Sequence, residues 1–319
     1  MSRLLQQVVA CAPVMLACLL LRVCVPLPAT ARTIEVGSDR PMKTPSEAAA
    51  IAQDGDHIVI DAGAYFDCAV WRANNLVIEG TGQPADTVIT DKTCMGKALF
   101  ITTGQDIAVR NLTLTRARVP DGNGAGIRME GRNLTVERVR FINNQNGILT
   151  VSRAPGSALV IRDSAFIRNG VCEKICSHGV YAGHLDLLHV ERSEFTETRQ
   201  GHHIKSRAGR TEVLDCDIED GPEGTASYLI EAPNGGSVLI RGNTLQKGPK
   251  SENRSTAISI GAEGVDQPTR EITIEDNAFR LGGSYRTVFV TNMTATEAVL
   301  KGNRIPDTVK PLRGDGEVH

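Results

Sequence analysis

Apolar and polar positions alternate in short stretches that recur along most of the chain. Each copy is a strand in which every second residue is apolar, followed by two polar residues and a bulky apolar one. Eight copies can be aligned: IAVRNLTL (107–114), LTVERVRF (134–141), LVIRDSAF (159–166), LHVERSEF (188–195), EVLDCDIE (212–219), VLIRGNTL (238–245), ITIEDNAF (272–279) and AVLKGNRI (298–305). Their bulky residues lie 23 to 34 positions apart, which is the period of a repeat architecture.

Each copy also contains a second short strand. These strands read GIRM (126–129), GILTV (147–151), GVYA (179–182), HIKS (203–206), YLIE (228–231), AISI (257–260) and VFVT (288–291). A unit of two or three short strands without a helical pattern cannot bury its own apolar face, whereas a stack of such units can. The pattern therefore predicts an all-β fold, a right-handed parallel β-helix of about nine coils over residues 76–305.

Asparagine occupies one position in three successive copies, at Asn243, Asn277 and Asn303. Asparagine tolerates the left-handed backbone conformation of tight turns, and its side chain can bond to neighbouring backbone groups. We expect these residues to form the turn between two sheets.

The segment 44–67 has a different pattern and predicts a cap. Ser46 can cap a short amphipathic helix from Glu47 to Ala52, since serine is a favoured N-cap residue. A turn at 54–56 leads into an apolar strand at 57–60. Such a helix would cover the open end of the coil stack, which is otherwise an exposed sheet edge.

This opening, with its helix, Gly-Asp turn, strand and G-x-Y turn at 63–65, resembles that of the pectin-lyase-like β-helix proteins. Together with the repeats, the resemblance covers residues 44–305. It implies the right-handed parallel β-helix fold, but it does not imply one chemistry, because many activities share this scaffold.

Residues 1–31 have the features of a signal peptide. The apolar run from Val8 to Leu21 is short for a membrane span and is followed by Arg22, and Ala29 to Ala31 forms an A-x-A cleavage site. An uncleaved anchor is the alternative. We expect a secreted or periplasmic protein without a stable membrane anchor, with one β-helix domain over 32–310 and a polar tail over 311–319.

Charge and cysteine content narrow the possible partners. The formal net charge is −2, so no global basic field favours nucleic acid as a partner. In an exported protein, disulfides are permitted. Cys68 and Cys94 could join neighbouring coils, and Cys172 and Cys176 could close a small loop, although a zinc site with nearby histidines is an alternative for that second pair. Cys216 lies in a strand pattern and is expected to be a buried thiol.

Five of the seven histidines cluster in one part of the chain. They are His178, His184, His189, His202 and His203. Counting alternate residues from Ile204, taken as inward, places His203, Lys205 and Arg207 on the outward face and His202 and Ser206 inside. An alternative for His178 and His202 is that they are core histidines stacked in successive coils.

One coil earlier, Tyr181 aligns beside Lys205 and is flanked by Gly179 and Gly183. We expect a groove here with a basic wall and a phenol. The residues predicted to bind substrate around it are Arg128, His178, His184, His202 and Glu231. The alternative is a solvated polar face.

The outward residues suit chemistry on a uronic acid. Removing the proton beside a sugar carboxylate needs a base, a cation for the carboxylate and a proton donor for the leaving oxygen. Neighbouring cations disfavour the charged form of a lysine, so Lys205 is the predicted base, with Arg207 as the cation and Tyr181 or His203 as the donor. Only one tryptophan, Trp71, is available to stack on neutral sugars, which favours an anionic polysaccharide as the partner.

Ile204, Lys205 and Ser206 also resemble part of the I-x-x-K-S strand that carries the lysine base in the chondroitinase B and alginate lyase family. That family has calcium-binding carboxylates just before the lysine, where this chain has Thr198 and Gln200. It has an arginine one coil later, where Ala226 and Ser227 stand. We therefore expect no cofactor, and calcium is the alternative, although the carboxylates expected to bind it are missing.

The sequence thus predicts an exported β-helix protein that acts on an acidic polysaccharide by lyase-type or epimerase-type proton abstraction. The alternatives are a non-catalytic glycan-binding or surface-structural β-helix, and a scaffold that has lost its site. Hydrolysis by paired carboxylates ranks below lyase chemistry, although acidic residues cluster in one coil at Asp215, Asp217, Glu219 and Asp220. The oligomeric state stays undetermined.

Overall fold

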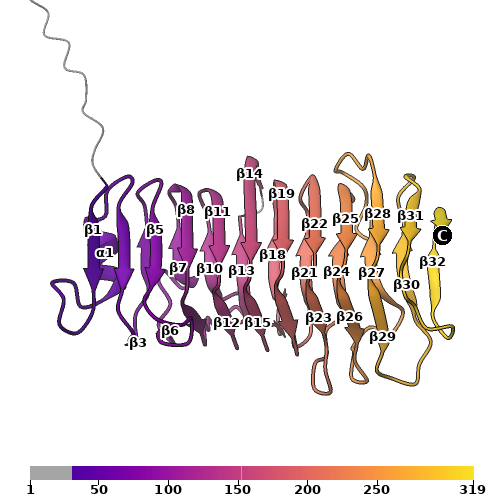
Figure 1. Ribbon diagram of the computed structural model, residues 1–319, viewed down its shortest axis with the longest axis horizontal. Helices are drawn as coiled ribbons and strands as arrows, with labels where there is room; N and C mark the ends of the chain where they lie inside the picture. The colour runs from indigo at the N-terminus through magenta and orange to yellow at the C-terminus, as the bar shows by residue number, and fades with distance from the viewer. Residues whose placement is uncertain (1–30, 152) are drawn as a thin grey trace, which may run out of the picture. The chain divides into compact units, whose positions relative to one another are not determined.

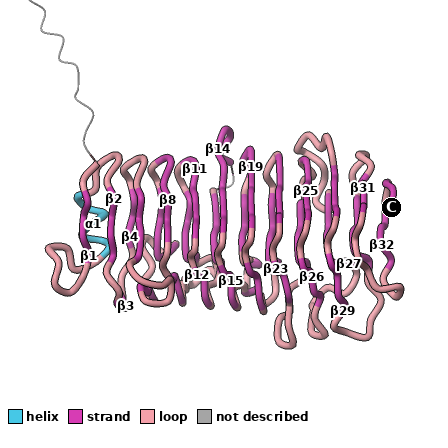
Figure 2. Tube along the Cα trace, in the orientation of Figure 1, coloured by secondary structure: helices cyan, strands magenta, loops and turns pink. Residues whose placement is uncertain are grey.

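The chain from Ala31 onward winds into a stack of short parallel strands. The structure is a computed structural model that describes residues 31–319 except residue 152, and the predicted signal peptide lies outside the described residues apart from Ala31. Successive coils follow one another in chain order from indigo to yellow (Figure 1), and loops join the strands at each corner (Figure 2). Among the described residues no helix is long and apolar enough to cross a membrane.

Three parallel sheets form the stack, and each coil from β2 to β30 adds one strand to each sheet. The twelve-stranded sheet contains β1 (Thr33–Val36), β2 (His57–Ile60), β5 (Val77–Gly80), β8 (Gln105–Arg110), β11 (Arg132–Glu137), β14 (Arg153–Arg162), β19 (His184–Glu191), β22 (Arg210–Leu214), β25 (Ser237–Arg241), β28 (Ile272–Glu275), β31 (Ala298–Lys301) and β33 (Gly316–Val318).

The ten-stranded sheet contains β4 (Ala69–Trp71), β7 (Ala98–Thr102), β10 (Ala125–Met129), β13 (Asn146–Thr150), β18 (Val180–Ala182), β21 (His202–Ser206), β24 (Tyr228–Ala232), β27 (Thr256–Ile260), β30 (Val288–Asn292) and β32 (Lys310–Arg313). The nine-stranded sheet contains β3 (Gly63–Tyr65), β6 (Thr87–Thr90), β9 (Thr113–Thr115), β12 (Arg140–Ile142), β15 (Ala165–Ile167), β20 (Glu194–Thr196), β23 (Asp217–Glu219), β26 (Thr244–Lys247) and β29 (Ala278–Leu281).

The predicted fold class is confirmed, since this is a right-handed parallel β-helix of about ten turns. The structure has strands beyond both ends of the predicted coils, which span residues 76–305. Strand β1 pairs with β2 and so begins the stack before the cap. At the other end, β32 pairs with β30 and β33 pairs with β31. The prediction of a polar tail over 311–319 is therefore wrong, because these residues add strands to two of the sheets.

The single described helix, α1 (Pro45–Ile51), follows β1 and occupies the segment predicted as a cap. Its N-cap is Thr44, whose hydroxyl accepts the Glu47 N–H, and not Ser46 as expected. The Ser46 N–H instead bonds to the Asp67 carboxylate at 2.8 Å. Ala48 is fully buried in the main core, so the helix packs against the first coils.

The bulky residues of the repeat form the inward stack that the sequence predicts. Phe141, Phe166 and Phe195 lie on β12, β15 and β20, one coil apart. Their rings are nearly parallel, with centroids 4.6 Å and 4.5 Å apart. Stacking of this kind adds to the hydrophobic gain of burying each ring, which ties the middle coils together.

Asn243, Asn277 and Asn303 form a ladder along one corner. Each side-chain oxygen accepts a backbone N–H from the coil before it, as in the 3.0 Å bond from Asn243 N to Asn277 Oδ1. Each side-chain amide donates to a carbonyl of the coil before it. The expected left-handed conformation falls on the residue before each asparagine, at Gly242, Asp276 and Gly302. Cys216 is a buried thiol whose sulfur occupies the same corner one coil earlier.

Lys247 is fully buried inside the coil, where its Nζ donates to the Ser227 carbonyl at 2.8 Å. Burial lowers the pKa of Lys247 to about 8, and the nearby Asp220 carboxylate opposes this only in part. Between pH 8 and the ordinary lysine pKa, the unfolded chain therefore binds more protons than the folded one. Because raising the pH favours the state with fewer bound protons, the free energy of unfolding rises with pH across this window.

We expect Lys247→Met to remove that rise. The measurement is the urea midpoint of wild type and variant at several pH values from about 7 to about 10. Lys250→Met serves as the matched control, because Lys250 is exposed and pairs with exposed Glu223. A rise in stability that persists unchanged in Lys247→Met would assign the effect to another group.

Candidate functional site

One column of outward side chains crosses the ten-stranded sheet. Strand register places Arg128, Leu149, Tyr181, Lys205 and Glu231 side by side in five successive coils. The predicted alignment of Tyr181 with Lys205 and of Arg128 two coils before Tyr181 is therefore confirmed. The register also settles the direction of Glu231, which shares the outward face with Lys205.

The predicted directions of His202 and His203 are wrong and must be exchanged. His203 is fully buried, with its ring edge against Phe195 and its two nitrogens bonded to Thr198 Oγ1 at 2.8 Å and Asp220 Oδ1 at 2.9 Å. His202 faces the groove. His203 and Ile204 thus both turn inward in succession, so alternation counted back from Ile204 fails at this corner. His203 is then no candidate for the proton donor.

The residue at the position of His203 is inward in every neighbouring coil. The column runs through Leu99, Gly126, Gly147, Gly179, His203, Leu229, Ala257 and Phe289. A Cβ on Gly126 or Gly147 would lie 2.7 Å from the ring of Phe141 or Phe166, so the phenylalanine stack excludes side chains there. Gly179 is likewise inward and does not flank the groove. These aligned glycines are the sequence signal that could have revealed the corner.

A groove of about 600 Å³ lies over the outward column, and Lys205, Arg207 and Tyr181 line it together. The other residues of this groove are Asn123, Asn146, Leu149, Ile175, Cys176, His178, Gly201, His202, Ser227 and Glu252. The sequence prediction that the basic residues share a groove with the phenol is thus confirmed, with His202 in the place expected for His203.

Two carboxylates hold the cations of the groove. Lys205 Nζ lies 3.0 Å from Glu231 Oε2 and 2.6 Å from Glu263 Oε1. Arg207 contacts the other Glu263 oxygen and the Asn234 side chain, and its Nε donates to the Tyr181 oxygen at 2.8 Å. Sequence reasoning missed Glu263, which comes from the loop between β27 and β28, two coils further on.

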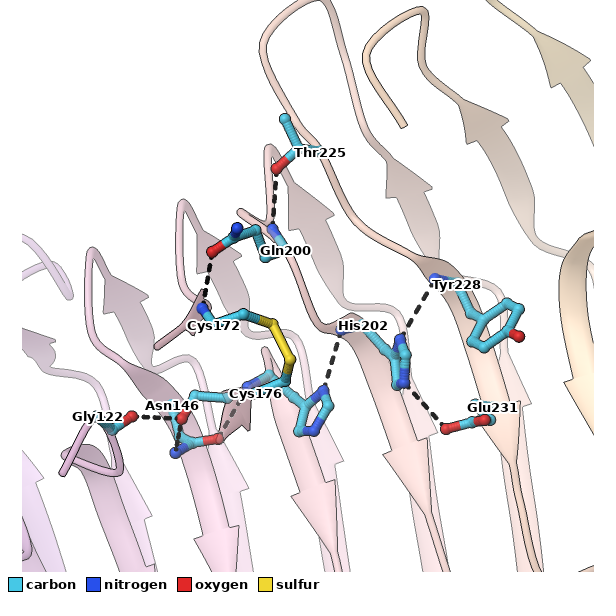
Figure 3. Close-up of a disulfide and its surroundings, with 11 residues drawn as sticks. Gly122, Asn146, Cys172, Cys176, Gln200, His202, Thr225, Tyr228 and Glu231 are labelled. Carbon is cyan, nitrogen blue, oxygen red and sulfur yellow. Dashed lines mark hydrogen bonds and ion pairs between the residues drawn. A yellow bond between two sulfur atoms is a disulfide. The ribbon is translucent and has the colours of Figure 1, made fainter. Parts of the chain in front are cut away.

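His178 and His202 stack in successive coils, with ring centroids 4.7 Å apart. His178 Nδ1 accepts the His202 N–H, and His202 Nδ1 accepts the Tyr228 N–H. His202 Nε2 lies 3.0 Å from Glu231 Oε2, and Figure 3 draws this contact. Backbone donors at both Nδ1 atoms leave the ring proton of each neutral histidine on Nε2. The expected stacking is confirmed, but it occurs beside the groove and not in the core.

Burial and neighbouring charge set the protonation of these groups. Burial, followed by the charges of His202, Lys205 and Arg207, holds the pKa of His178 well below its usual value, so His178 is neutral. Burial also raises the pKa of Glu231, but the contacts with His202 and Lys205 outweigh this, and the pKa is lowered overall. Glu231 is therefore an anion that fixes His202 and Lys205.

The Cys172–Cys176 loop borders the groove. The two cysteines form a disulfide and belong to the antiparallel strands β16 (Val171–Cys172) and β17 (Cys176–Ser177). Figure 3 shows how side chains tie this loop to its neighbours, with Cys172 N bonded to Gln200 and Gln200 N bonded to Thr225. Ile175 is exposed and lines the groove. The second expected disulfide, Cys68–Cys94, is also present.

Two residues predicted to bind substrate lie elsewhere. His184 lines a different cavity, of about 1040 Å³, and lies 3.5 Å from Asp266. Arg128 is two coils away from Tyr181 on the outward face, with its Nε 3.7 Å from Glu130, and it does not line the groove.

The acidic residues considered for hydrolysis do not converge. Asp220 points into the coil to His203, whereas Glu219 pairs with Arg280 on the surface.

Within residues 31–319, as far as they are described, no three histidine, cysteine or acidic side chains are grouped to hold a metal ion. In place of the calcium carboxylates, Thr198 bonds to His203 and Gln200 bonds to Cys172.

Comparison with solved structures gives the fold. An alginate lyase from Paenibacillus sp. superposes with a TM-score of 0.52 at 16% identity, over 89% of this chain and 99% of that one. Pectin methylesterase PemA from Erwinia chrysanthemi gives 0.48 at 11% identity, over 90% and 94%. The A-module of mannuronan C-5 epimerase AlgE6 from Azotobacter vinelandii gives 0.41 at 15% identity, over 85% and 93%.

These proteins share the right-handed parallel β-helix. This chain has that fold. No family model matches its sequence, and no curated protein does so either. At 16% identity the superposition on the alginate lyase supports the architecture and leaves the chemistry to the residues of the groove.

Proposed function

We propose that the protein acts on a uronic-acid-containing polysaccharide that lies along the outward face of the ten-stranded sheet. The observation that carries this proposal is one groove lined by Lys205, Arg207 and Tyr181. Two cations that contact carboxylate oxygens, with Lys205 Nζ 2.6 Å from Glu263 Oε1, favour an acidic ligand. The superposed alginate lyase, whose name states an acidic polysaccharide substrate, agrees with this choice. The leader-like segment and the two disulfides support export to an oxidising compartment.

The contacts of the groove suggest a division of roles for lyase or epimerase chemistry. Lys205 and Arg207 both already contact carboxylate oxygens, as they would in binding a sugar carboxylate, so we assign both to the uronate carboxylate and no longer propose Lys205 as the base. Arg207 Nε donates to the Tyr181 oxygen at 2.8 Å and so holds the phenol beside Lys205, and a positioned phenol can transfer protons as a general acid or base. Tyr181 is therefore the proposed proton-transfer group.

The proposed step balances without a cofactor. Tyr181 takes the proton from the carbon beside the carboxylate, and the released electron pair forms a double bond to the neighbouring ring carbon. The glycosidic C–O bond at that carbon breaks, and the leaving oxygen takes the proton. Return of a proton to the opposite face of the first carbon, without C–O cleavage, would give epimerisation instead.

The test is incubation of the wild-type protein with alginate, polygalacturonate and glycosaminoglycans. Elimination is expected to produce the ultraviolet absorbance of unsaturated uronates, and epimerisation is expected to change the proton NMR spectrum of the polymer. Absence of both signals on every polymer would remove the enzymatic proposal.

A non-catalytic glycan-binding protein is the second candidate. The ion pairs that already occupy Lys205 and Arg207 favour it, because a binding surface needs no free base. It predicts retention on an anionic polymer that weakens smoothly with salt and yields no product.

A further inference from the structure

Glu263 bridges the two cations of the groove with one carboxylate. Its Oε1 lies 2.6 Å from Lys205 Nζ, and its Oε2 contacts the Arg207 guanidinium. Lys205 and Arg207 lie on β21 and just after it, whereas Glu263 comes from a loop two coils later. One oxygen on a lysine and the other on an arginine is also the arrangement in which these residues would bind a free carboxylate.

The backbone of this loop is anchored independently of the Glu263 side chain. The Glu263 N–H donates to the Pro233 carbonyl at 2.9 Å, and the Asn234 side-chain amide donates to the Gly264 carbonyl at 3.1 Å. The Glu263 side chain itself is 42% exposed. The carboxylate can therefore leave the cations by rotation of the side chain while the loop stays in place.

We propose that Lys205 and Arg207 form a subsite for a uronate carboxylate, and that Glu263 occupies this subsite as an internal ligand which the sugar must displace. The identity of the ligand rests on the proposed function. Because the cations cannot serve both carboxylates fully, each molecule of bound uronate must compete with Glu263. Glu263 thus sets the affinity and restricts the subsite to ligands that replace both of its contacts.

Other contacts keep the cations in place when Glu263 is removed. Lys205 retains its ion pair with Glu231, and Arg207 retains Tyr181 and Asn234. A neutral residue at position 263 should therefore leave a preformed site. If Glu263 were instead needed to position Lys205 and Arg207, its replacement would weaken binding.

The experiment compares wild type with Glu263→Gln, using sodium glucuronate as the probe and the ligand-dependent increase in Tm as the readout. The expected result is tighter glucuronate binding by Glu263→Gln, by about tenfold, which corresponds to one charge-assisted hydrogen bond. Glu194→Gln is the matched control, because it makes the same change of charge at an exposed position on the nine-stranded sheet. It should bind glucuronate as wild type does.

Equal or weaker glucuronate binding by Glu263→Gln, or no binding by either protein, would overturn the inference. Retention on alginate and polygalacturonate, measured in parallel, tests the proposed function separately. If Glu263→Gln gains affinity for glucuronate while neither protein retains a polymer, the subsite stands and the polysaccharide proposal falls. If a polymer binds wild type and Glu263→Gln equally, the polysaccharide proposal stands and the role of Glu263 falls.

Discussion

Turnover of a uronate polymer is expected to fall about 10²- to 10⁴-fold in Tyr181→Phe, the usual contribution of a positioned proton-transfer group. The phenylalanine ring keeps the shape of the groove wall, so retention on the polymer should change little. Arg207→Ala should differ, because it removes contacts to the carboxylate as well as the donor to the Tyr181 oxygen. Loss of a hydrogen bond to a charged group costs about 1.5–3 kcal/mol, so binding and turnover should both decrease.

The measurement is the initial rate of product formation together with retention on the immobilised polymer. Tyr285→Phe is the matched control, because its hydroxyl bonds to the Gly248 carbonyl and lies outside the groove. Lys205→Arg separates the two possible roles of Lys205. Substantial activity in this variant would agree with Lys205 as a carboxylate-binding cation. Complete loss of turnover with unchanged binding would instead indicate that Lys205 is the base.

Asp220→Ala is expected to destabilise the fold by several kcal/mol, because each buried donor left without its partner costs about 1–3 kcal/mol. Asp220 is fully buried and accepts bonds from His203 Nε2, Gly248 N and Ser251 Oγ. Alanine would leave all three donors without this partner inside the coil. Urea unfolding measures the effect through the shift of the midpoint.

The contribution of Asp220 to the free energy of unfolding is expected to decrease at low pH. Burial raises the pKa of Asp220, but the bonds from His203, Gly248 and Ser251 outweigh burial and lower it overall. A carboxylate of this kind contributes stability above its unfolded pKa of 3.8, and the contribution is lost as the pH falls through the lower folded value. The stability difference between wild type and Asp220→Asn should therefore decrease in strong acid.

His203→Leu provides a second variant with an informative outcome. Leucine already occupies the equivalent inward position one coil later, at Leu229. In the Asp220→Ala variant the buried His203 imidazole lacks its partner, and adding His203→Leu removes that imidazole. The double variant should therefore lose less stability than the sum of the losses in the two single variants. Strict additivity would mean that the two side chains do not stabilise each other.

The repeat was readable from sequence because its apolar positions recur at the same place in every coil. Phe141, Phe166 and Phe195 could be assigned to the interior from this alone, and the structure stacks them there. The alignment of Tyr181 with Lys205 followed from the same register. Strand pairing in a parallel stack is a local property, so one good alignment carries over to the neighbouring coils.

The site was only partly predictable because two of its features break the regular pattern. His203 and Ile204 turn inward in succession, which alternation does not allow for, and this exchanged the roles of His202 and His203. Glu263 reaches Lys205 from a loop 58 residues further along the chain. Loop side chains carry no periodic signal, so the strand pattern gives no reason to pair these two residues.

The side chains of the asparagine ladder all bond to the coil that precedes them in the chain. Asn303 supplies both an acceptor and a donor to the coil before it, and Asn277 does the same one coil earlier. Each coil in this region is thus completed by the one that follows it in the chain. Loss of the last coil would expose unpaired amide and carbonyl groups on the coil before it. During synthesis from the N-terminus, every new coil would then close the hydrogen bonds that its predecessor had left open.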